Sequence, residues 1–290
     1  MSEARGVPMP APMDDAHSGS RMGELGRRVL SIAVLLPLFV WVLVAAPPWL
    51  FTVVVVAVGL LGNWEFSRMF DRAGVPVLRD AGLVWGGLVT LAFVRPERAG
   101  AAFALVVVGL LVASLDAGAA GPAPWQRVAV TLLGVCYVNW LLGHVLSLRA
   151  LPDGLHWVLL LVWITWAGET AAYVVGSLIG RHKLAPSISP GKTVEGALAQ
   201  FVASVLAAVT AGGWLFPGLQ LRDALVVGVL LGLFGQIGDL TESALKRSVG
   251  TKDTGQVIPG HGGILDRIDG LLFNAPALFY YVTYGRALHA

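Results

Sequence analysis

Ionisable residues follow an apolar run in the segment GDLTESALKR, residues 238–247. Asp239 and Glu242 are three positions apart, so a helix would place them on one face, and Lys246 lies four positions beyond Glu242. The Glu242–Lys246 pair could be a salt bridge at an exposed helix end. Asp239 should lie near a membrane boundary, where an ionisable group is costly, so its position favours a functional role.

A second acidic group lies in GGILDRIDG, residues 262–270, where Asp266 and Asp269 are three positions apart. Carboxylates this close repel one another unless a cation lies between them. Mg²⁺ commonly binds through one or two carboxylates together with substrate phosphates, so a magnesium site is the functional interpretation. The alternative is a capped helix start with a local ion pair.

The segment PGHGG, residues 259–263, precedes these carboxylates. Backbone N–H groups in glycine-rich turns can form a nest that binds anions. His261 could bond to a phosphate oxygen, although a single loop histidine more often has a structural role.

The segment SISPGKTVEG, residues 187–196, contains the Gly-Lys-Thr that ends a phosphate-binding P-loop. The full P-loop pattern fails, because Pro186 stands where its first glycine should be and no preceding strand is expected. What remains is Lys192 and hydroxyl groups before a helix that should begin near Thr193, and a helix N-terminus attracts phosphate. An ordinary loop with a basic residue is the alternative, but we favour phosphate binding.

An acidic residue also lies inside the apolar segment WAGETAAYVVG, residues 166–176. Glu169 is expected in one half of a membrane span, where an unpaired carboxylate is expensive. It could be a metal ligand or the partner of a Lys or Arg, and the sequence leaves both open.

The composition shows what must position these residues. Of 290 residues, 56% are hydrophobic and only 13% are charged, whereas soluble domains have about a quarter of their residues charged. A membrane span needs roughly 20 mostly apolar residues, so the sequence predicts a multi-pass membrane protein. The fold should be all-α, because helices satisfy their own backbone hydrogen bonds in lipid. The single cysteine, Cys136, excludes a disulfide within the chain.

Nine apolar runs are candidate spans, at 29–46, 49–66, 81–94, 100–115, 128–147, 155–178, 194–216, 223–241 and 271–287. Eight or ten spans are alternatives. We expect a flexible cytoplasmic tail at 1–28, N-terminal transmembrane helices at 29–150 and a catalytic transmembrane region at 151–290.

The basic residues orient these spans. With the N-terminus in the cytoplasm, 15 of the 20 Lys and Arg residues fall on the cytoplasmic side. The positive-inside rule therefore favours this orientation. The polar segments at 180–196 and 242–270 then share the cytoplasmic face of the cell's inner (plasma) membrane.

A family resemblance rests on SALKRSVGTKDTGQVIPGHGGILDRID, residues 243–269. This stretch resembles the signature of phosphatidate cytidylyltransferases, also called CDP-diacylglycerol synthases, at every fixed position. SPGKTVEG and GDLTES are similar to the family as well. The resemblance covers about 166–275 by motif and the earlier part of the chain by hydropathy alone.

The resemblance implies the reaction of CTP with phosphatidate from the inner leaflet, giving CDP-diacylglycerol and pyrophosphate. It implies Mg²⁺, with a monovalent cation such as K⁺ as a second ion. Membrane lipid is the surrounding partner, no nucleic acid is expected, and a homodimer is left open. The implied metal ligands are Asp239, Asp266, Asp269 and Glu169. The implied catalytic residues are Asp239, Asp266, Lys246, Arg247, Lys252, Asp253 and Arg267, and the implied substrate-binding residues are Ser189, Lys192, Thr193, Glu195, His261, Gly262 and Gly263.

One departure from the family pattern concerns Glu169, which stands where family members usually carry Asp. Its longer arm could reach the same site, or it could change activity or cation preference. Two other functions compete with the resemblance. A CTP-using lipid kinase would need the same polar groups, and a transporter could also carry intramembrane charges. The spacing expected of a CDP-alcohol phosphotransferase is absent.

Overall fold

The computed structural model describes residues 37–116, 124–255 and 262–286, so the expected tail at 1–28 lies outside the described residues. Residues 37–44 are helical. The further helices are α2 (Pro48–Arg72), α3 (Arg79–Ala92), α4 (Pro96–Asp116), α5 (Pro124–Gly134), α6 (Leu141–Ala150), α7 (Gly154–Ile179), α8 (Val194–Ala211), α9 (Leu221–Ser248) and α10 (Leu265–Tyr280), with π-helical segments η1 (Val135–Trp140) and η2 (Tyr281–Gly285). The fold is all-α, as predicted, apart from one small hairpin.

Six helices in the described part of the chain are long and apolar enough to cross a membrane. They are Pro48–Arg72, Pro96–Leu115, Trp125–Ala150, Gly154–Ile179, Val194–Ala211 and Leu221–Ser248. The chain is therefore a multi-pass membrane protein. At 14 and 16 residues, α3 and α10 are shorter than these six. Nine spans and a cytoplasmic N-terminus stay predictions.

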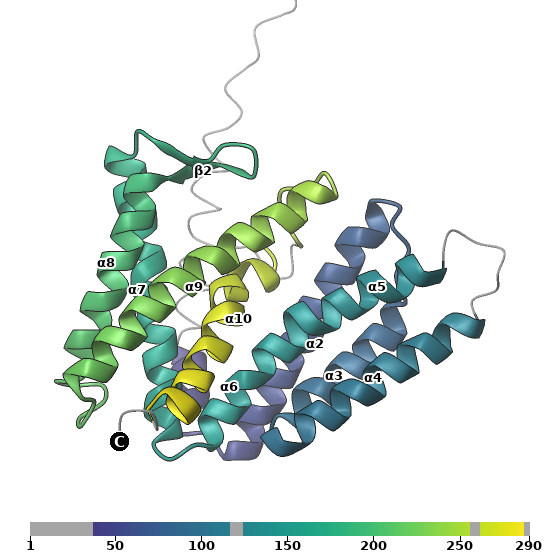
Figure 1. Cartoon of the computed structure of the whole chain (residues 1–290), viewed down its shortest axis with the longest axis horizontal. Helices are drawn as coiled ribbons and strands as arrows, with labels where there is room; N and C mark the ends of the chain where they lie inside the picture. Colours follow the sequence, from purple (N-terminus) through teal and green to yellow (C-terminus); the bar gives the residue numbers. More distant parts are fainter. Residues whose placement is uncertain (1–36, 117–123, 256–261, 287–290) are drawn as a thin grey trace, which may run out of the picture.

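Helix α10 packs between two groups of helices (Figure 1). It contacts α7 and α9 of one group, and α2 and α6 of the other. In the first group α8 packs on both α7 and α9, whereas the second group contains α2 to α6. The C-terminal end of α9, the N-terminal end of α10 and β2 lie toward the same end of the molecule, at the top of Figure 1.

The hairpin joins α7 to α8 at this end. Its strands β1 (Lys183–Ala185) and β2 (Ser189–Thr193) are antiparallel. The sequence did not predict them, because three and five residues are too few for a recognisable alternation. The helix start expected near Thr193 is confirmed, because the Thr193 hydroxyl caps α8 by accepting a hydrogen bond from the Gly196 N–H.

Buried amides connect α2, α3 and η1. The Asn63 side chain donates to Asn139 Oδ1 over 2.5 Å, and Asn139 donates to Thr90 Oγ1 over 3.1 Å. Such side chains bond across helices where no water is present to satisfy them. A Cβ atom at Gly86 would lie 2.7 Å from Asn139 Cγ and 2.8 Å from Asn63 Nδ2, so this network requires glycine there.

We expect Gly86→Ala to destabilise the protein by about 1–3 kcal/mol, because the added methyl group separates the buried amides from their partners. The control is Gly100→Ala on α4, where a Cβ atom meets nothing within 4 Å. Thermal unfolding in detergent should show a lower melting temperature for Gly86→Ala only. Equal melting temperatures for the two variants would contradict this role of Gly86.

Candidate active site

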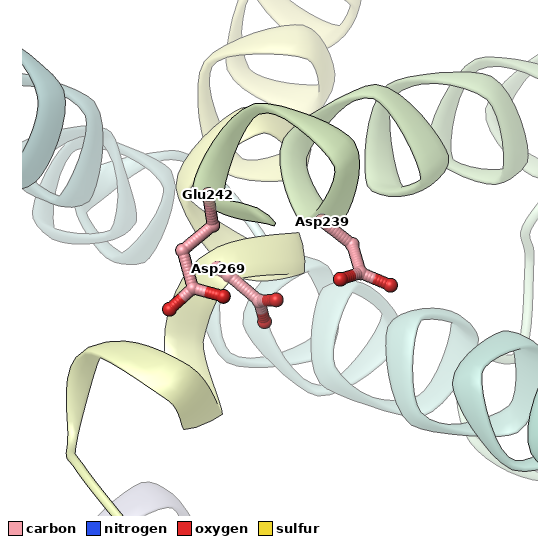
Figure 2. Close-up of side chains that lie close together, drawn as sticks. All are labelled: Asp239, Glu242 and Asp269. Atoms are coloured by element: carbon pink, nitrogen blue, oxygen red, sulfur yellow. The ribbon is translucent and has the colours of Figure 1, made fainter. Parts of the chain in front are cut away.

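Three carboxylates converge where α9 meets α10. Asp239 and Glu242 come from α9 and Asp269 from α10, and one oxygen of each lies within 4.8 Å of the others. Figure 2 shows Asp269 between the two α9 side chains. Glu242 and Asp269 are buried, and Glu242 Oε1 is a buried oxygen without a hydrogen-bond partner among the described residues. Because hard divalent cations prefer such oxygen ligands, this donor set fits a metal ion.

Lys246 connects this carboxylate triad (Asp239, Glu242, Asp269) to the start of α10. Its Nζ lies 2.8 Å from Glu242 Oε2, one helical turn back, and 2.8 Å from Asp266 Oδ1. The expected Glu242–Lys246 pair is therefore confirmed. However, the Glu242 side chain is only 2% exposed and that of Lys246 14%, so this is a buried ion pair.

Lys192 reaches the triad from the opposite side. The β2 strand carries it, and its Nζ lies 2.7 Å from Asp239 Oδ2. The two polar segments that the sequence singles out, at 180–196 and 242–270, thus meet in space. A lysine and an acidic cluster that are far apart in sequence form one site.

Asp266 has different neighbours from the triad. It accepts hydrogen bonds from the Gly263 N–H over 3.0 Å and from the Thr254 hydroxyl over 2.9 Å, besides its ion pair with Lys246. Burial by itself would raise the pKa of Asp266, but the Lys246 charge and these hydrogen bonds outweigh it, so the pKa lies below its usual value. Asp266 is therefore held as an anion that pairs with Lys246. Glu242 joins Asp239 and Asp269 in the triad, and Asp266 as a metal ligand stays a prediction.

Glu169 on α7 faces the same region. It interacts electrostatically with Asp239, Lys192 and Arg267. A Cβ atom at position 270 would collide with Glu169 Oε1, so Gly270 allows this carboxylate to approach α10. Both interpretations of Glu169 remain consistent with this position, since a carboxylate and two basic side chains surround it.

A cavity of about 440 Å³ opens beside Glu169 and Asp239, between α7, α8, α9 and the hairpin. Tyr173, Gln200 and Gln236 line its walls, and Ser189, Lys192 and Thr193 line it on the hairpin side. Three of the predicted substrate-binding residues therefore border one cavity. The Thr193 hydroxyl already accepts the Gly196 N–H, so its acceptor capacity is partly used.

Other predicted residues make local contacts. The Glu195 carboxylate accepts hydrogen bonds from the Arg181 and His182 N–H groups and thereby joins the hairpin to α8. Arg247 donates to the carbonyl oxygens of Ile188 and Thr251.

The remaining predicted residues lie near the ends of α9 and α10. Lys252 and Asp253 are exposed on the loop after α9, and Arg267 is exposed on the first turn of α10. Gly262 has a positive φ of 88°, which favours glycine, and Gly263 donates to Asp266. His261 lies outside the described residues.

The sequence analysis missed two carboxylates near the site. Glu242 was placed on the same helical face as Asp239 but was not named among the expected metal ligands. Glu65 on α2 is completely buried and accepts a hydrogen bond from the Leu265 N–H at the start of α10. The sequence shows Glu65 near the end of an apolar run, but it does not reveal the contact with Leu265, which lies 200 residues away.

Comparison of the sequence with known proteins identifies the family to which this chain belongs. Residues 26–285 match the sequence profile of the Cytidylyltransferase family. Phosphatidate cytidylyltransferase of Staphylococcus haemolyticus (strain JCSC1435) is 40% identical over 154 residues, which are 53% of this chain and 58% of that protein. Phosphatidate cytidylyltransferase of Staphylococcus epidermidis (strain ATCC 12228 / FDA PCI 1200) is 36% identical over 174 residues, 60% of this chain and 66% of that protein.

A relative named "Uncharacterized protein YnbB" in Escherichia coli (strain K12) is also 40% identical, over 155 residues that are 53% of this chain and 51% of that protein. The chain thus aligns with about half to two thirds of the length of these curated relatives. The family match itself runs from residue 26 to residue 285 and includes every element of the site, and it confirms the resemblance seen in the sequence: the chain belongs to the cytidylyltransferase family.

Proposed function

We propose that this protein transfers the cytidylyl group of CTP to phosphatidate, giving CDP-diacylglycerol and pyrophosphate. The observation that carries this proposal is the buried carboxylate triad between Lys192 and Lys246, beside a cavity, in a membrane protein of the cytidylyltransferase family. The relatives named phosphatidate cytidylyltransferase support the choice of lipid.

The chemistry needs no activated side-chain nucleophile. A phosphate oxygen of phosphatidate attacks the α-phosphorus of CTP and forms the new O–P bond. The bond from the α-phosphorus to the oxygen that bridges to the β-phosphorus breaks, and pyrophosphate leaves with the electron pair. The protein's task is to position two anions and stabilise their charge, as in other phosphoryl-transfer enzymes.

Asp239, Glu242 and Asp269 would hold the divalent cation, for which we propose Mg²⁺. When bound, this ion supplies positive charge that offsets repulsion between the phosphates and stabilises the leaving pyrophosphate. Asp266 and Glu169, also predicted as ligands, border this set. Asp266 keeps Lys246 oriented, and Glu169 lines the cavity.

The nucleotide is proposed to occupy the cavity of about 440 Å³. Lys192 lies at its edge next to Asp239, so one ammonium group can contact phosphate while it faces the cation ligands. Ser189 supplies a further hydroxyl, and the positive end of α8 favours an anion nearby. Arg247, Lys252, Asp253, His261 and Gly262 remain predicted parts of this substrate region.

The lipid is proposed to approach through a second groove. An apolar groove of about 430 Å³ is lined by residues 37–44, α2, α7 and the first turns of α10. Its lining includes Trp41, Trp166 and Ile268 together with one cation, Arg267. Acyl chains match the apolar walls and a phosphate group matches Arg267, so this groove suits the two chemically different ends of phosphatidate.

The proposed membrane side is based on the distribution of basic residues. We propose that the site faces the cytoplasm at the inner membrane, because 15 of the 20 basic residues fall on that side when the N-terminus is cytoplasmic. A site on that face would have access to cytosolic nucleotides, and the inner leaflet would present the phosphatidate headgroup to the same face.

Product analysis tests the proposed reaction. Purified protein in detergent micelles with phosphatidate, Mg²⁺ and CTP labelled at the α-phosphate should give labelled CDP-lipid and one pyrophosphate per lipid consumed. Release of labelled CDP with a newly phosphorylated lipid would show the kinase reaction instead. No consumption of CTP with phosphatidate would refute the proposed acceptor.

We expect Asp269→Asn to lower turnover by more than about 100-fold, because loss of a residue that only supports a metal ligand already costs about 10–100-fold. Binding of Mn²⁺, followed by electron paramagnetic resonance, should weaken in the same variant. Asp80→Asn is the control, since the Asp80 side chain is 92% exposed on α3 and lies outside the triad. Unchanged Mn²⁺ binding in Asp269→Asn would exclude this carboxylate as a ligand.

We expect Lys192→Ala to raise KM for CTP about 10-fold, which corresponds to about 1.4 kcal/mol of lost binding. The KM for phosphatidate should change little, because the lipid is proposed to bind in the apolar groove, whose lining does not include Lys192. Lys183→Ala serves as the control, because Lys183 is an exposed lysine on the neighbouring strand. A change confined to the KM for phosphatidate would assign Lys192 to the lipid phosphate.

A further inference from the structure

Glu65 on α2 is a carboxylate in an unusual place. It is 0% exposed, and it comes from the group of helices that does not carry the triad. Its Oε2 accepts the Leu265 N–H over 2.8 Å and lies 3.4 Å from the Thr254 hydroxyl. These partners are 200 and 189 residues away in sequence, so only the tertiary fold brings them together.

Glu65 is one end of a continuous chain of polar contacts. The Thr254 hydroxyl that faces Glu65 also lies 2.9 Å from Asp266 Oδ2. Asp266 Oδ1 in turn pairs with Lys246, which pairs with Glu242 of the triad. Each of these distances, except the one from Thr254 to Glu65, is below 3.0 Å. A displacement at Glu65 can therefore be transmitted to a proposed cation ligand.

The start of α10 depends on two carboxylates. Asp266 accepts the Gly263 N–H, and Glu65 accepts the Leu265 N–H. The first N–H groups of a helix have no partner within the helix, and the N-terminus favours negative charge. Glu65 thus satisfies a donor that the local sequence leaves open, and the positive end of α10 stabilises its charge inside the protein.

The loop around Glu65 leaves room only for glycine. A Cβ atom at Gly255 would approach Glu65 Oε1, and one at Gly263 would approach Glu65 Oε2 and the Thr254 hydroxyl. Backbone before the PGHGG segment, at Gly255, and backbone at its last residue, Gly263, therefore pack directly on this carboxylate. An apolar side chain at position 65 would leave the Leu265 N–H without an acceptor, so packing alone does not account for glutamate at position 65.

We propose that Glu65 is a positioning residue for the active site: it anchors the backbone at 254–255 and 263–265 and so holds Asp266 where Asp266 orients Lys246 against Glu242. Glu65 itself touches neither substrate nor the triad. The helices at 29–150 then contribute to catalysis as well as to membrane spanning. The kinetic part of this inference rests on the proposed cytidylyl transfer, whereas the anchoring part does not.

The test uses the full chain in detergent and compares Glu65→Gln with wild type. Glutamine keeps the size, but its neutral carbonyl is a weaker acceptor than a carboxylate. We expect kcat to fall about 10–100-fold with KM for CTP within about threefold, as for loss of a supporting residue. Hydrogen exchange at the amides of Gly263 and Leu265 should become about 10-fold faster.

A second variant and a control separate positioning from general destabilisation. Thr254→Val removes the hydroxyl between Glu65 and Asp266 without disturbing α2. The double variant, Glu65→Gln with Thr254→Val, should be about as active as the less active of the two single variants, because both changes break the same series of polar contacts. Ser67→Ala is the control: Ser67 is buried on the same helix but bonds to Asn63, so its kcat and exchange should match wild type.

The outcomes distinguish this inference from the proposed function. If wild type is inactive with CTP and phosphatidate but Glu65→Gln still accelerates exchange at Gly263 and Leu265, the proposed reaction fails and the anchoring stands. If exchange is unchanged, or if kcat stays within about twofold of an active wild type, Glu65 is not a positioning residue. Full additivity of the two variants would likewise overturn the shared chain of contacts.

Discussion

The mutual repulsion of three carboxylates dominates this structure. Asp239, Glu242 and Asp269 lie within 4.8 Å of one another at one end of an apolar helical bundle. Such a cluster is unfavourable unless positive charge lies close by. Lys192 from the hairpin and Lys246 from α9 supply that charge on opposite sides. Because a buried charge without its partner is strongly destabilising, the hairpin, α9 and α10 must keep their relative positions.

The contacts that fix the position of α10 next to the triad can be understood from this requirement. Helix α10 is short, and it contacts both groups of helices. Its N-terminal turn carries Asp266, and Asp269 follows one turn later, so a small shift along α10 would separate both from Lys246 and Glu242. Hydrogen bonds from several elements oppose such a shift: Thr254 and Gly263 to Asp266, and Leu265 to Glu65. The N-terminal helices therefore support the site through α2, although the residues of the triad come from α9 and α10.

Much of this arrangement could be predicted from the sequence, because its signals are local. The apolar run at 155–178 became a helix at Gly154–Ile179, and Thr193 caps the helix expected there. The Glu242–Lys246 pair follows from helical spacing. Other features depend on contacts between distant residues. The β1–β2 hairpin is too short for a pattern, and the role of Asp266 depends on Thr254 and Lys246. Glu65 is visible in the sequence as a carboxylate in an apolar run, but its hydrogen-bond partner could not be predicted, because Leu265 lies 200 residues away.

The separation of 200 residues between Glu65 and Leu265 affects the order in which the protein can assemble during synthesis. Helix α2 is synthesised and inserted long before Leu265 leaves the ribosome, and during this interval the Glu65 carboxylate has no backbone donor from α10. A charged group in the membrane is costly, so early α2 would favour a shallow position in which Glu65 reaches the headgroups and water. When α10 later emerges, its Leu265 N–H supplies the missing donor to Glu65. The contacts that complete the candidate active site would in this way form only after α2 has entered the membrane.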